Sequence, residues 1–209
     1  MKISLTNCGK RFNREWIFRK FSYDFLNGET YAITGPNGSG KSTLLQVIGG
    51  AIVTSEGTIS YADKQSGAIQ ADDVFRQISI AAPYLEVVEE MTLMEFLEFH
   101  QQFKPFLPGT DISQAIARVG LTPAVNKQIR YYSSGMKQRV KLLQAIFSDV
   151  SCVLLDEPCT NLDAEGIRMY QQLIADHGGN RTIIVSSNDV QEYGFCNHTI
   201  SISDYKKLR

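Results

Sequence analysis

The amino-acid sequence predicts an α/β protein whose sheet contains parallel strands. Strand-like runs alternate with helix-like segments through the second half of the chain. Two of those runs, Cys152–Leu155 and Thr182–Ser186, are largely apolar, as strands buried on both faces of a sheet are. The chain has 209 residues, of which 43% are apolar and 21% charged, so a disordered or fibrous protein is excluded. This length indicates one domain, residues 1–209, with room for a subdomain.

The first third of the chain is rich in strand signals. Alternating residues, aromatic clusters and the turn at Asn27-Gly28 mark the runs. A helix-like segment, Ser42–Ile48, interrupts them. The expected strands are Lys2–Asn7, Trp16–Phe25, Tyr31–Thr34, Thr58–Tyr61 and Ile78–Ala82.

Residues 84–131 are predicted to form a helical insert between the strand-rich first part of the chain and its last third. Thr92 and Glu95 have the spacing of a capping box at a helix start, and Asp111 with Gln114 repeats it. Gly120 is placed to end the second helix. We therefore expect a small helical subdomain here.

The last third returns to alternating helices and strands. Ser133 or Ser134 is placed to cap a helix that carries apolar residues up to Phe147. A further helix is expected at Ala164–His177, where Gly178-Gly179 ends it. The final strand is expected at Thr199–Ser203.

Composition also argues against several classes of protein. Lys and Arg total 21 against 22 for Asp and Glu, so no strong net charge favours nucleic acid as a partner. The longest apolar stretch, Leu44–Val53, is far shorter than the roughly 20 residues of a membrane span, and the first residues lack the pattern of a signal peptide. We therefore expect a cytoplasmic protein. The four scattered cysteines predict no disulfide framework or zinc site and are expected to be ordinary, mostly buried residues.

A glycine-rich segment carries the strongest chemical signal. Residues 35–42 match G-x-x-x-x-G-K-[ST] throughout, after a predicted strand and before a predicted helix. Glycines let the backbone N–H groups turn toward a phosphate, and the helix N-terminus adds partial positive charge. Lys41 supplies a point charge for the β- and γ-phosphates, and the Ser42 hydroxyl suits Mg²⁺. A mere turn does not require this pattern, so a nucleoside triphosphate site is predicted.

Two carboxylates follow the buried run Cys152–Leu155. Because the carboxyl ends of parallel strands meet the phosphates in such folds, Asp156 is expected to hold Mg²⁺ and Glu157 to polarise an attacking water. Acidic residues at strand ends are common, so this pair alone would not indicate a metal or catalytic site. The presence of the phosphate loop in the same chain is what supports these two roles.

A third segment, Tyr132–Met136, reveals a family resemblance. It stands where the ATP-binding subunits of ABC transporters have the LSGGQ signature, 24 residues before Asp156. Asn161–Asp163 resembles the D-loop of that family. Phe12, 23 residues before Gly35, matches the aromatic residue that stacks on adenine, with Trp16 as a nearby alternative. The chain as a whole resembles this family.

The resemblance implies an ABC-type ATPase fold: a P-loop core with a mixed sheet, an antiparallel β subdomain and a small helical subdomain. It also implies ATP and Mg²⁺ as cofactors and a full set of site residues. Those expected to bind ATP are Phe12, Gly35, Pro36, Asn37, Gly38, Ser39, Gly40, Lys41, Ser42, Thr43, Ser134 and Gly135; those expected to bind the metal are Ser42 and Asp156; those expected to be catalytic are Glu157, Asn188 and Lys41.

The resemblance further implies two kinds of partner. In the family, two subunits close head to tail, so that each ATP lies between one P-loop and the partner's signature. A helix N-terminus at Ser134 and Gly135 suits that anion. Ser133 and Ser134 also suit simple capping of the following helix, and the two roles are compatible. A separate transmembrane permease is implied as well, with an export-type subunit favoured by the wording of residues 134–139 and by the short C-terminus. The helical insert is expected to meet the permease, unless its aromatic residues Phe96, Phe99, Phe103 and Phe106 form its own core.

Three positions depart from the family pattern. Pro83-Tyr84 stands where the family has a glutamine ligand, Met136 replaces the last signature residue, and Asn188 stands at the place of the switch histidine. None of the three histidines is expected to replace it. These departures predict slow turnover, and at the extreme an ATP-dependent clamp. A soluble ABC protein that acts on ribosomes or DNA is the remaining alternative. Proteins of that class usually carry a second ATP module or a long coiled coil, and this sequence shows neither, which favours the transporter subunit.

The basic residues Lys10, Arg11, Arg14, Arg19 and Lys20 are expected to form a solvated hairpin face rather than a nucleic-acid site.

Overall fold

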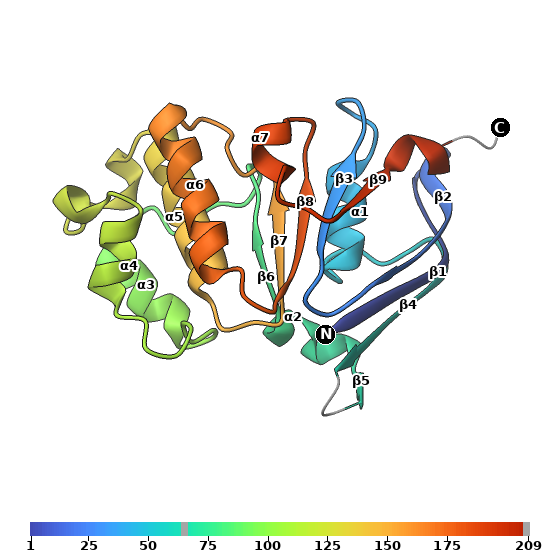
Figure 1. Cartoon of the computed structure of the whole chain (residues 1–209), viewed down its shortest axis with the longest axis horizontal. Helices are drawn as coiled ribbons and strands as arrows, with labels where there is room; N and C mark the ends of the chain where they lie inside the picture. The colour runs from blue at the N-terminus through green and yellow to red at the C-terminus, as the bar shows by residue number, and fades with distance from the viewer. Residues whose placement is uncertain (64–66, 207–209) are drawn as a thin grey trace.

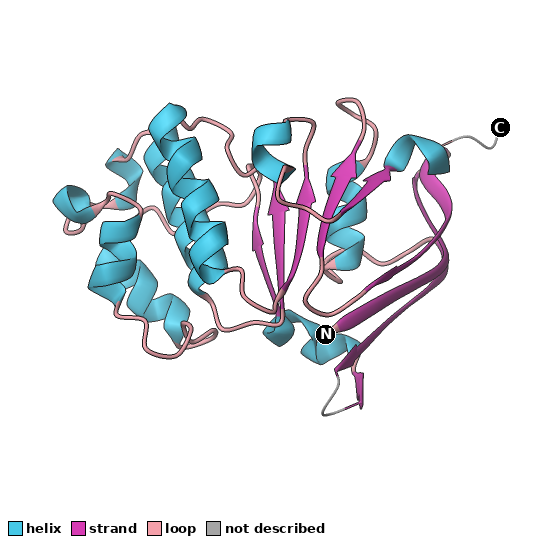
Figure 2. Ribbon diagram, in the orientation of Figure 1, coloured by secondary structure: helices cyan, strands magenta, loops and turns pink. Residues whose placement is uncertain are grey.

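The computed structural model describes residues 1–63 and 67–206. Within them the strands form two sheets (Figures 1 and 2). The first is antiparallel and has the order β2 (Glu15–Phe25), β1 (Lys2–Phe12), β4 (Glu56–Asp63), β5 (Gly67–Ile69). The second is parallel and has the order β6 (Ile78–Ala81), β7 (Cys152–Asp156), β8 (Thr182–Ser186), β3 (Thr30–Thr34), β9 (His198–Ser201). The antiparallel β subdomain implied by the resemblance is thus present as a sheet of its own, and the described strands of the core sheet all pair in parallel.

Seven α-helices accompany the sheets in the described part of the chain. They are α1 (Lys41–Ile48), α2 (Val74–Gln77), α3 (Leu93–Gln101), α4 (Ile112–Arg118), α5 (Ser134–Phe147), α6 (Ala164–His177) and α7 (Val190–Tyr193). An antiparallel β region lies at one end of the molecule and a helical region at the other, with the parallel sheet between them (Figure 1). None of these helices is long and apolar enough to cross a membrane.

The inner strand β7, between β6 and β8, explains how one sheet contributes to two hydrophobic cores. All its residues are buried, and because side chains alternate between faces, the strand serves both sides. Val153 and Leu155 pack with the helical side, which includes α5 and α6. Cys152 and Leu154 pack with α1 and the antiparallel sheet. The apolar run seen in the sequence is therefore the wall shared by two hydrophobic clusters.

Capping chemistry defines the helices of residues 84–131. The Thr92 hydroxyl accepts from the Glu95 N–H and the Glu95 carboxylate accepts from the Thr92 N–H, which is a complete capping box. Asp111 accepts from the Gln114 N–H, without a reciprocal bond described from the Gln114 side chain. Gly120 has a φ of +71° after the end of α4, a conformation that favours glycine.

The four aromatic residues of this helical region divide into two pairs. Phe96 and Phe106 are buried, whereas Phe99 is 45% and Phe103 64% exposed. The exposed rings pack edge to face with centroids 5.1 Å apart. Burial therefore assigns one pair to the core of this region and leaves the other on its surface.

The last strand is shorter than the sequence pattern predicts. We expected a strand at Thr199–Ser203, but β9 ends at Ser201, where its partner β3 ends at Thr34. The chain continues as a 3₁₀ turn, Ile202–Tyr205, in which Ile202 is fully buried. The prediction of a strand beyond Ser201 was therefore wrong, because β3 offers no further residues with which the strand could pair there.

Among the cysteines, Cys8, Cys152 and Cys159 are buried and Cys196 is partly exposed; all four are free thiols.

Candidate functional site

The loops at the carboxyl edge of the parallel sheet bring together residues from three distant parts of the sequence. The strands β3, β7 and β8 end at the same edge (Figure 2). Their register pairs Asp156 with Ser186 and Ser186 with Ile33, so the strand ends are level. The glycine-rich loop follows β3, Glu157 follows β7, and Asn188 follows β8. Such an edge is where α/β sheets bind ligands.

The glycine-rich loop has the conformation that an anion cradle needs. Gly35, Gly38 and Gly40 have φ values of +147°, +71° and +103°, which other residues rarely adopt. A Cβ on Gly40 would also lie 2.3 Å from a methyl carbon of Ile17, so glycine is required there on steric grounds too. Gly40 is the N-cap of α1 and provides no side-chain cap. The first N–H groups of α1 are therefore available to a bound anion.

Lys41 is the first residue of α1, directly after this loop, and is only 5% exposed. Its Nζ donates to the carbonyl oxygens of Gly35, at 2.8 Å, and Pro36, at 3.4 Å. A buried ammonium group requires such acceptors. Phosphate oxygens would satisfy it better, because they carry charge.

Asp156 and Ser42 provide oxygen atoms beside the loop. Asp156 is 1% exposed and its Oδ1 has no hydrogen-bond partner. Burial raises the pKa of Asp156, and a hydrogen bond from Ser42 opposes the rise. A buried carboxylate oxygen without a partner, next to a hydroxyl, fits the ligand preference of Mg²⁺. These two residues therefore suit the metal that the sequence pattern predicts.

Glu157 and Asn188 border the same loop from the other side. Glu157 lines a cavity of about 240 Å³ with the glycine-rich loop and a second one of about 350 Å³ with Asn188. The Asn188 side chain accepts from the Gly35 N–H at 3.2 Å and donates to Asn37 Oδ1 at 3.1 Å. Asn188 is thus hydrogen-bonded directly to the phosphate loop.

Phe12 and Trp16, the two candidates for the adenine contact, lie outside the cavity of the glycine-rich loop, which Ile17 lines instead. Phe12 is 47% exposed, and Lys10 Nζ lies 5.1 Å from its ring centroid. The Trp16 ring is covered by Arg19, at 4.1 Å, and contacted by Arg11, at 5.5 Å. Phe12 therefore keeps more free ring surface for a base.

The basic cluster near these rings is only partly the solvated face that we expected. Arg19 forms two hydrogen bonds with the Glu56 carboxylate, at 2.9 and 2.7 Å, and Lys10 donates to the Val53 carbonyl. The Glu56 carboxylate raises the pKa of Arg19 through that hydrogen bond. Arg19 thus links β2 to β4, and Lys10 links β1 to the segment that precedes β4.

The signature-like segment forms a separate site. Ser133 is the N-cap of α5 and accepts from the Met136 N–H at 3.2 Å. Ser134 and Gly135 line a cavity of about 470 Å³ together with Asn161, Asp163 and Arg139. A Cβ on Gly135 would lie 2.8 Å from the Asn161 carbonyl oxygen, so the two loops touch through their backbones.

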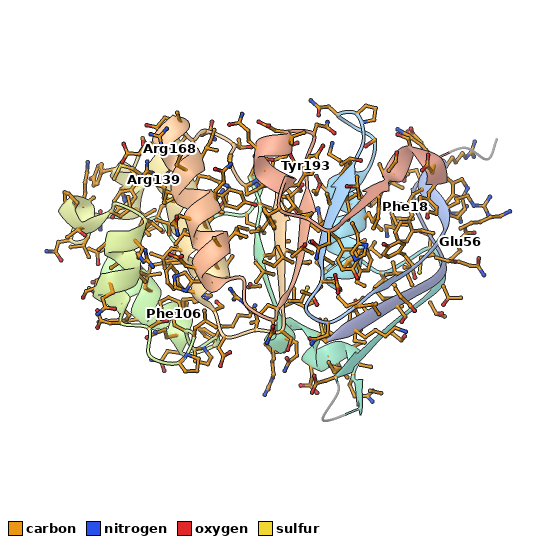
Figure 3. The ribbon with its side chains drawn as sticks, in the orientation of Figure 1. Phe18, Glu56, Phe106, Arg139, Arg168 and Tyr193 are labelled. Atoms are coloured by element: carbon orange, nitrogen blue, oxygen red, sulfur yellow. The ribbon has the colours of Figure 1, made fainter. Side chains whose placement is uncertain are left out.

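This second cavity shares no lining residue with that of the glycine-rich loop in the described part of the chain. Arg139, which lines it, lies at the opposite end of the molecule from Glu56 on the antiparallel sheet (Figure 3). Within one subunit, the structure therefore does not bring Ser134 and Gly135 to Lys41.

Pro83 and Tyr84, at the place of the missing glutamine, remain close to the metal candidate. Burial raises the pKa of Tyr84 to about 12, and the charge of Asp156 contributes to the rise. Lys141 of α5 donates to the Pro83 carbonyl at 2.9 Å and to the Ala82 carbonyl at 3.3 Å. The loop after β6 is thus held by the helix that begins at the signature-like segment.

Two buried polar residues of this site were not singled out from the sequence. Gln138 donates to the Pro158 carbonyl and Glu192 accepts from the Cys159 N–H, next to Glu157. Gln138 carries a sequence signal, since it is a polar residue in helical register with the buried Leu142 and Ala145. Glu192 carries none, because its helix is only four residues long.

Comparisons with known proteins agree with this geometry. Residues 18–160 match the family described as ABC transporter. The chain is 30% identical over 197 residues to the uncharacterized ABC transporter ATP-binding protein YybJ of Bacillus subtilis (strain 168), covering 91% of this chain and 87% of that protein. It is 30% identical over 199 residues to the cytochrome c biogenesis ATP-binding export protein CcmA of Rhizobium meliloti (strain 1021), covering 93% and 94%. The dimeric post-hydrolysis structure of the ATP-binding cassette MJ0796, bound to ADP and Pi, aligns with a TM-score of 0.79 at 21% identity over 95% of this chain and 93% of that one.

Proposed function

Because the chain belongs to the ABC transporter family and is an ATPase of that family, we propose that it is the motor subunit of an export-type transporter. In this role it dimerises around two ATP molecules and drives a separate transmembrane permease. The observation that carries the proposal is the convergence of Lys41, Asp156, Glu157 and Asn188 at one edge of the sheet.

ATP binding is proposed to replace contacts that the loop now makes with itself. The Lys41 amine would exchange the carbonyls of Gly35 and Pro36 for phosphate oxygens, which are stronger acceptors because they are charged. The N–H groups of residues 38–43 would bind the phosphates at the start of α1.

Hydrolysis is proposed to depend on Glu157. Ser42 and Asp156 would hold Mg²⁺, which would supply positive charge beside the phosphates. The Glu157 carboxylate takes a proton from a water molecule as the water oxygen attacks the γ-phosphorus; the bond between that phosphorus and its bridging oxygen breaks, and ADP leaves. Asn188, which accepts a hydrogen bond from the Gly35 N–H, is proposed to contact the same phosphate.

The dimer is proposed because the signature-like site needs a second copy or a close relative of this chain. Ser134 and Gly135 line a cavity of their own, away from Lys41 of the same subunit. Two subunits arranged head to tail would bring each signature to the partner's phosphate loop. The solved cassette MJ0796, with a similar fold, is a dimer with ADP and Pi bound.

The exposed rings of Phe99, on α3, and Phe103, two residues after the end of α3, support a permease contact. Phe99 and Phe103 form an apolar pair on the surface of the helical region, residues 84–131, which we propose is the subdomain that docks on the permease. The permease would hold the subunit at the cytoplasmic face of the membrane. The export direction rests on the similarity to CcmA, which is described as an export protein.

A slow ATP-dependent clamp is the second candidate, and Asn188 favours it. An amide at this position is neutral and already satisfied by Gly35 and Asn37. Phosphate release by the purified chain, measured with and without its permease, separates the two functions. Motor function requires hydrolysis that the permease stimulates, whereas a clamp binds ATP without releasing phosphate in either state.

Co-purification from detergent-solubilised membranes tests the permease partner. We expect a multi-span membrane protein to co-purify with the tagged chain and to be lost in the Phe99→Ser/Phe103→Ser variant. Val53→Ser is the matched control, since Val53 is 81% exposed and lies outside the helical region. Retention of the membrane protein by the double variant would contradict docking through this pair of rings.

A further inference from the structure

Glu157 has an unusual backbone conformation. Its φ is +41°, in the left-handed region that residues with a Cβ rarely adopt. Such a conformation persists only where the surrounding contacts hold it. The Glu157 N–H donates to the Ser186 carbonyl at 2.9 Å, which fixes the start of the turn. The rest of the turn must be held by the residues that follow.

The second peptide group after Glu157, between Pro158 and Cys159, is hydrogen-bonded on both sides by buried side chains. Its carbonyl accepts from Gln138 Nε2 at 2.7 Å, and its N–H donates to Glu192 Oε1 at 2.6 Å. Gln138 is 2% and Glu192 5% exposed. Hydrogen bonds in such a dry environment are strong, and the loss of either partner leaves a buried polar group unsatisfied. This peptide cannot rotate while both side chains are in place.

The two side chains come from functionally different segments. Gln138 lies on α5, one helical turn after Ser134 and Gly135 of the signature-like segment. Glu192 lies on α7, four residues after Asn188, and it lines the same 350 Å³ cavity as Glu157 and Asn188. Its backbone carbonyl accepts from the Tyr170 hydroxyl at 2.8 Å, which anchors α7 to α6.

The Glu192 carboxylate is also joined to the segment that carries Asn188. Burial raises the pKa of Glu192, and hydrogen bonds from the Ser187 hydroxyl and the Cys159 N–H oppose the rise. The Ser187 Oγ in turn accepts from the Asp189 N–H at 2.9 Å. A connected set of bonds therefore runs from the turn after β7 to the residues on either side of Asn188.

We propose that Gln138 and Glu192 are positioning residues that clamp the Pro158–Cys159 peptide and thereby hold the Glu157 carboxylate in its place for hydrolysis. Neither side chain contacts the phosphate loop cavity, so both act through the backbone of the turn. The proposal rests on the proposed role of Glu157. It makes the position of Glu157 depend on both α5 and the Asn188 segment.

Kinetic variants test the clamp. Glu192→Ala removes the acceptor, and we expect kcat to fall at least tenfold while KM for ATP changes less than twofold. Glu192→Gln keeps an acceptor oxygen at the same reach and is expected to stay within threefold of the wild-type kcat. Gln191→Ala, an exposed change on the same short helix, is the matched control. Gln138→Ala is expected to behave as Glu192→Ala does.

Two further measurements separate positioning from general stabilisation. Amide hydrogen exchange at Cys159 is expected to be at least tenfold faster in Glu192→Ala, with exchange in β8 unchanged. In the Glu157→Gln background, Glu192→Ala is expected to cause no additional loss, because the side chain that it positions is already inactive. If Glu192→Ala does not fold, Glu192→Asp, which keeps the charge but shortens the reach, takes its place with the same expectations for kcat and KM.

The outcomes distinguish the clamp from the function on which it rests. If Glu157→Gln leaves turnover intact, the proposed role of Glu157 fails. If Glu157→Gln stops turnover but Glu192→Ala stays within threefold of wild type, the clamp alone is overturned. Equal losses in the wild-type and Glu157→Gln backgrounds, or a failure of Glu192→Gln to restore kcat, would also overturn it.

Discussion

The glycine-rich loop and the signature-like segment begin two helices at the same edge of the molecule, but they differ in completeness. In the first, Lys41 and Asn188 both bond to the loop, and Asp156 and Ser42 lie beside it. In the second, Ser133 caps α5, while Ser134 and Gly135 line an open cavity away from the loop. Under the proposed function, the first region binds the phosphates of ATP within one subunit, and the second region acts only with a partner subunit.

Loss of the proposed general base, Glu157, is expected to have the largest effect on turnover. It also tests both regions together, because ATP that is not hydrolysed should hold two subunits in a dimer. Glu157→Gln should lower phosphate release by about a hundredfold or more, because a positioned general base contributes on that scale. ATP should remain bound, so light scattering with Mg-ATP should detect a dimer. Glu165→Gln, an exposed change at the start of α6, is the control. A variant that stays monomeric at high concentration and still binds ATP would contradict the two-subunit site.

Loss of Lys41 should disable the first region alone. In Lys41→Ala the charged hydrogen bonds to phosphate disappear, and these are worth about 1.5–3 kcal/mol, or about tenfold to a hundredfold in affinity. Calorimetry with ATP measures the change. Lys206→Ala is the matched control, because Lys206 Nζ also contacts this loop, at the Gly38 carbonyl, but is exposed. Equal losses in the two variants would contradict a specific role for Lys41.

Loss of Gly135 should disable the second region alone. In Gly135→Ala the new Cβ lies 2.8 Å from the Asn161 oxygen, so one of the two loops must shift. Overpacking of this kind costs about 1–3 kcal/mol, and we expect dimer-dependent turnover to fall by about tenfold or more. ATP affinity of the monomer, measured by calorimetry, should change less than twofold. A matching loss of monomer affinity would mean that the two regions are not independent.

The substitution Asn188→His tests whether position 188, in the first region, limits the rate of hydrolysis. Asn188→His should raise phosphate release by about tenfold, since a good hydrogen bond to a charged group is worth about 1.5–3 kcal/mol and the missing glutamine near Tyr84 limits the gain. Asn197→His, whose side chain bonds to Glu29 away from this edge, is the control. An unchanged or lower rate, with Glu157→Gln inactive, would show that position 188 is not the switch.

The smallest expected effect concerns the adenine contact. Phe12→Ala should weaken ATP binding by about twofold to tenfold, because aromatic stacking contributes about 0.5–1.5 kcal/mol. Trp16→Ala should change affinity less than twofold, since Arg19 and Arg11 already contact its ring. Titrations of ATP against a triphosphate without a base distinguish stacking from phosphate binding. The opposite order of the two variants would assign the contact to Trp16.

Elements with strong local signals were predicted well from the sequence. The helix Ala164–His177 and the strand Thr182–Ser186 have the expected bounds, and the Thr92 capping box forms as its spacing predicts. The short α2 and α7 were not predicted, because four residues carry too little periodicity. The last strand was predicted two residues too long, because its end depends on the length of its neighbour β3.

The sequence by itself determined the family, the phosphate loop and the carboxylates after β7, because each depends on residue types at fixed short spacing. Only the tertiary structure decided which aromatic residues of the helical region are exposed and where the last strand ends. It alone brought Asn188 to Gly35, and Gln138 and Glu192 to one peptide group. These contacts join residues 20 to 153 positions apart in the chain, and hydrogen bonds across such distances exist only once the core has packed.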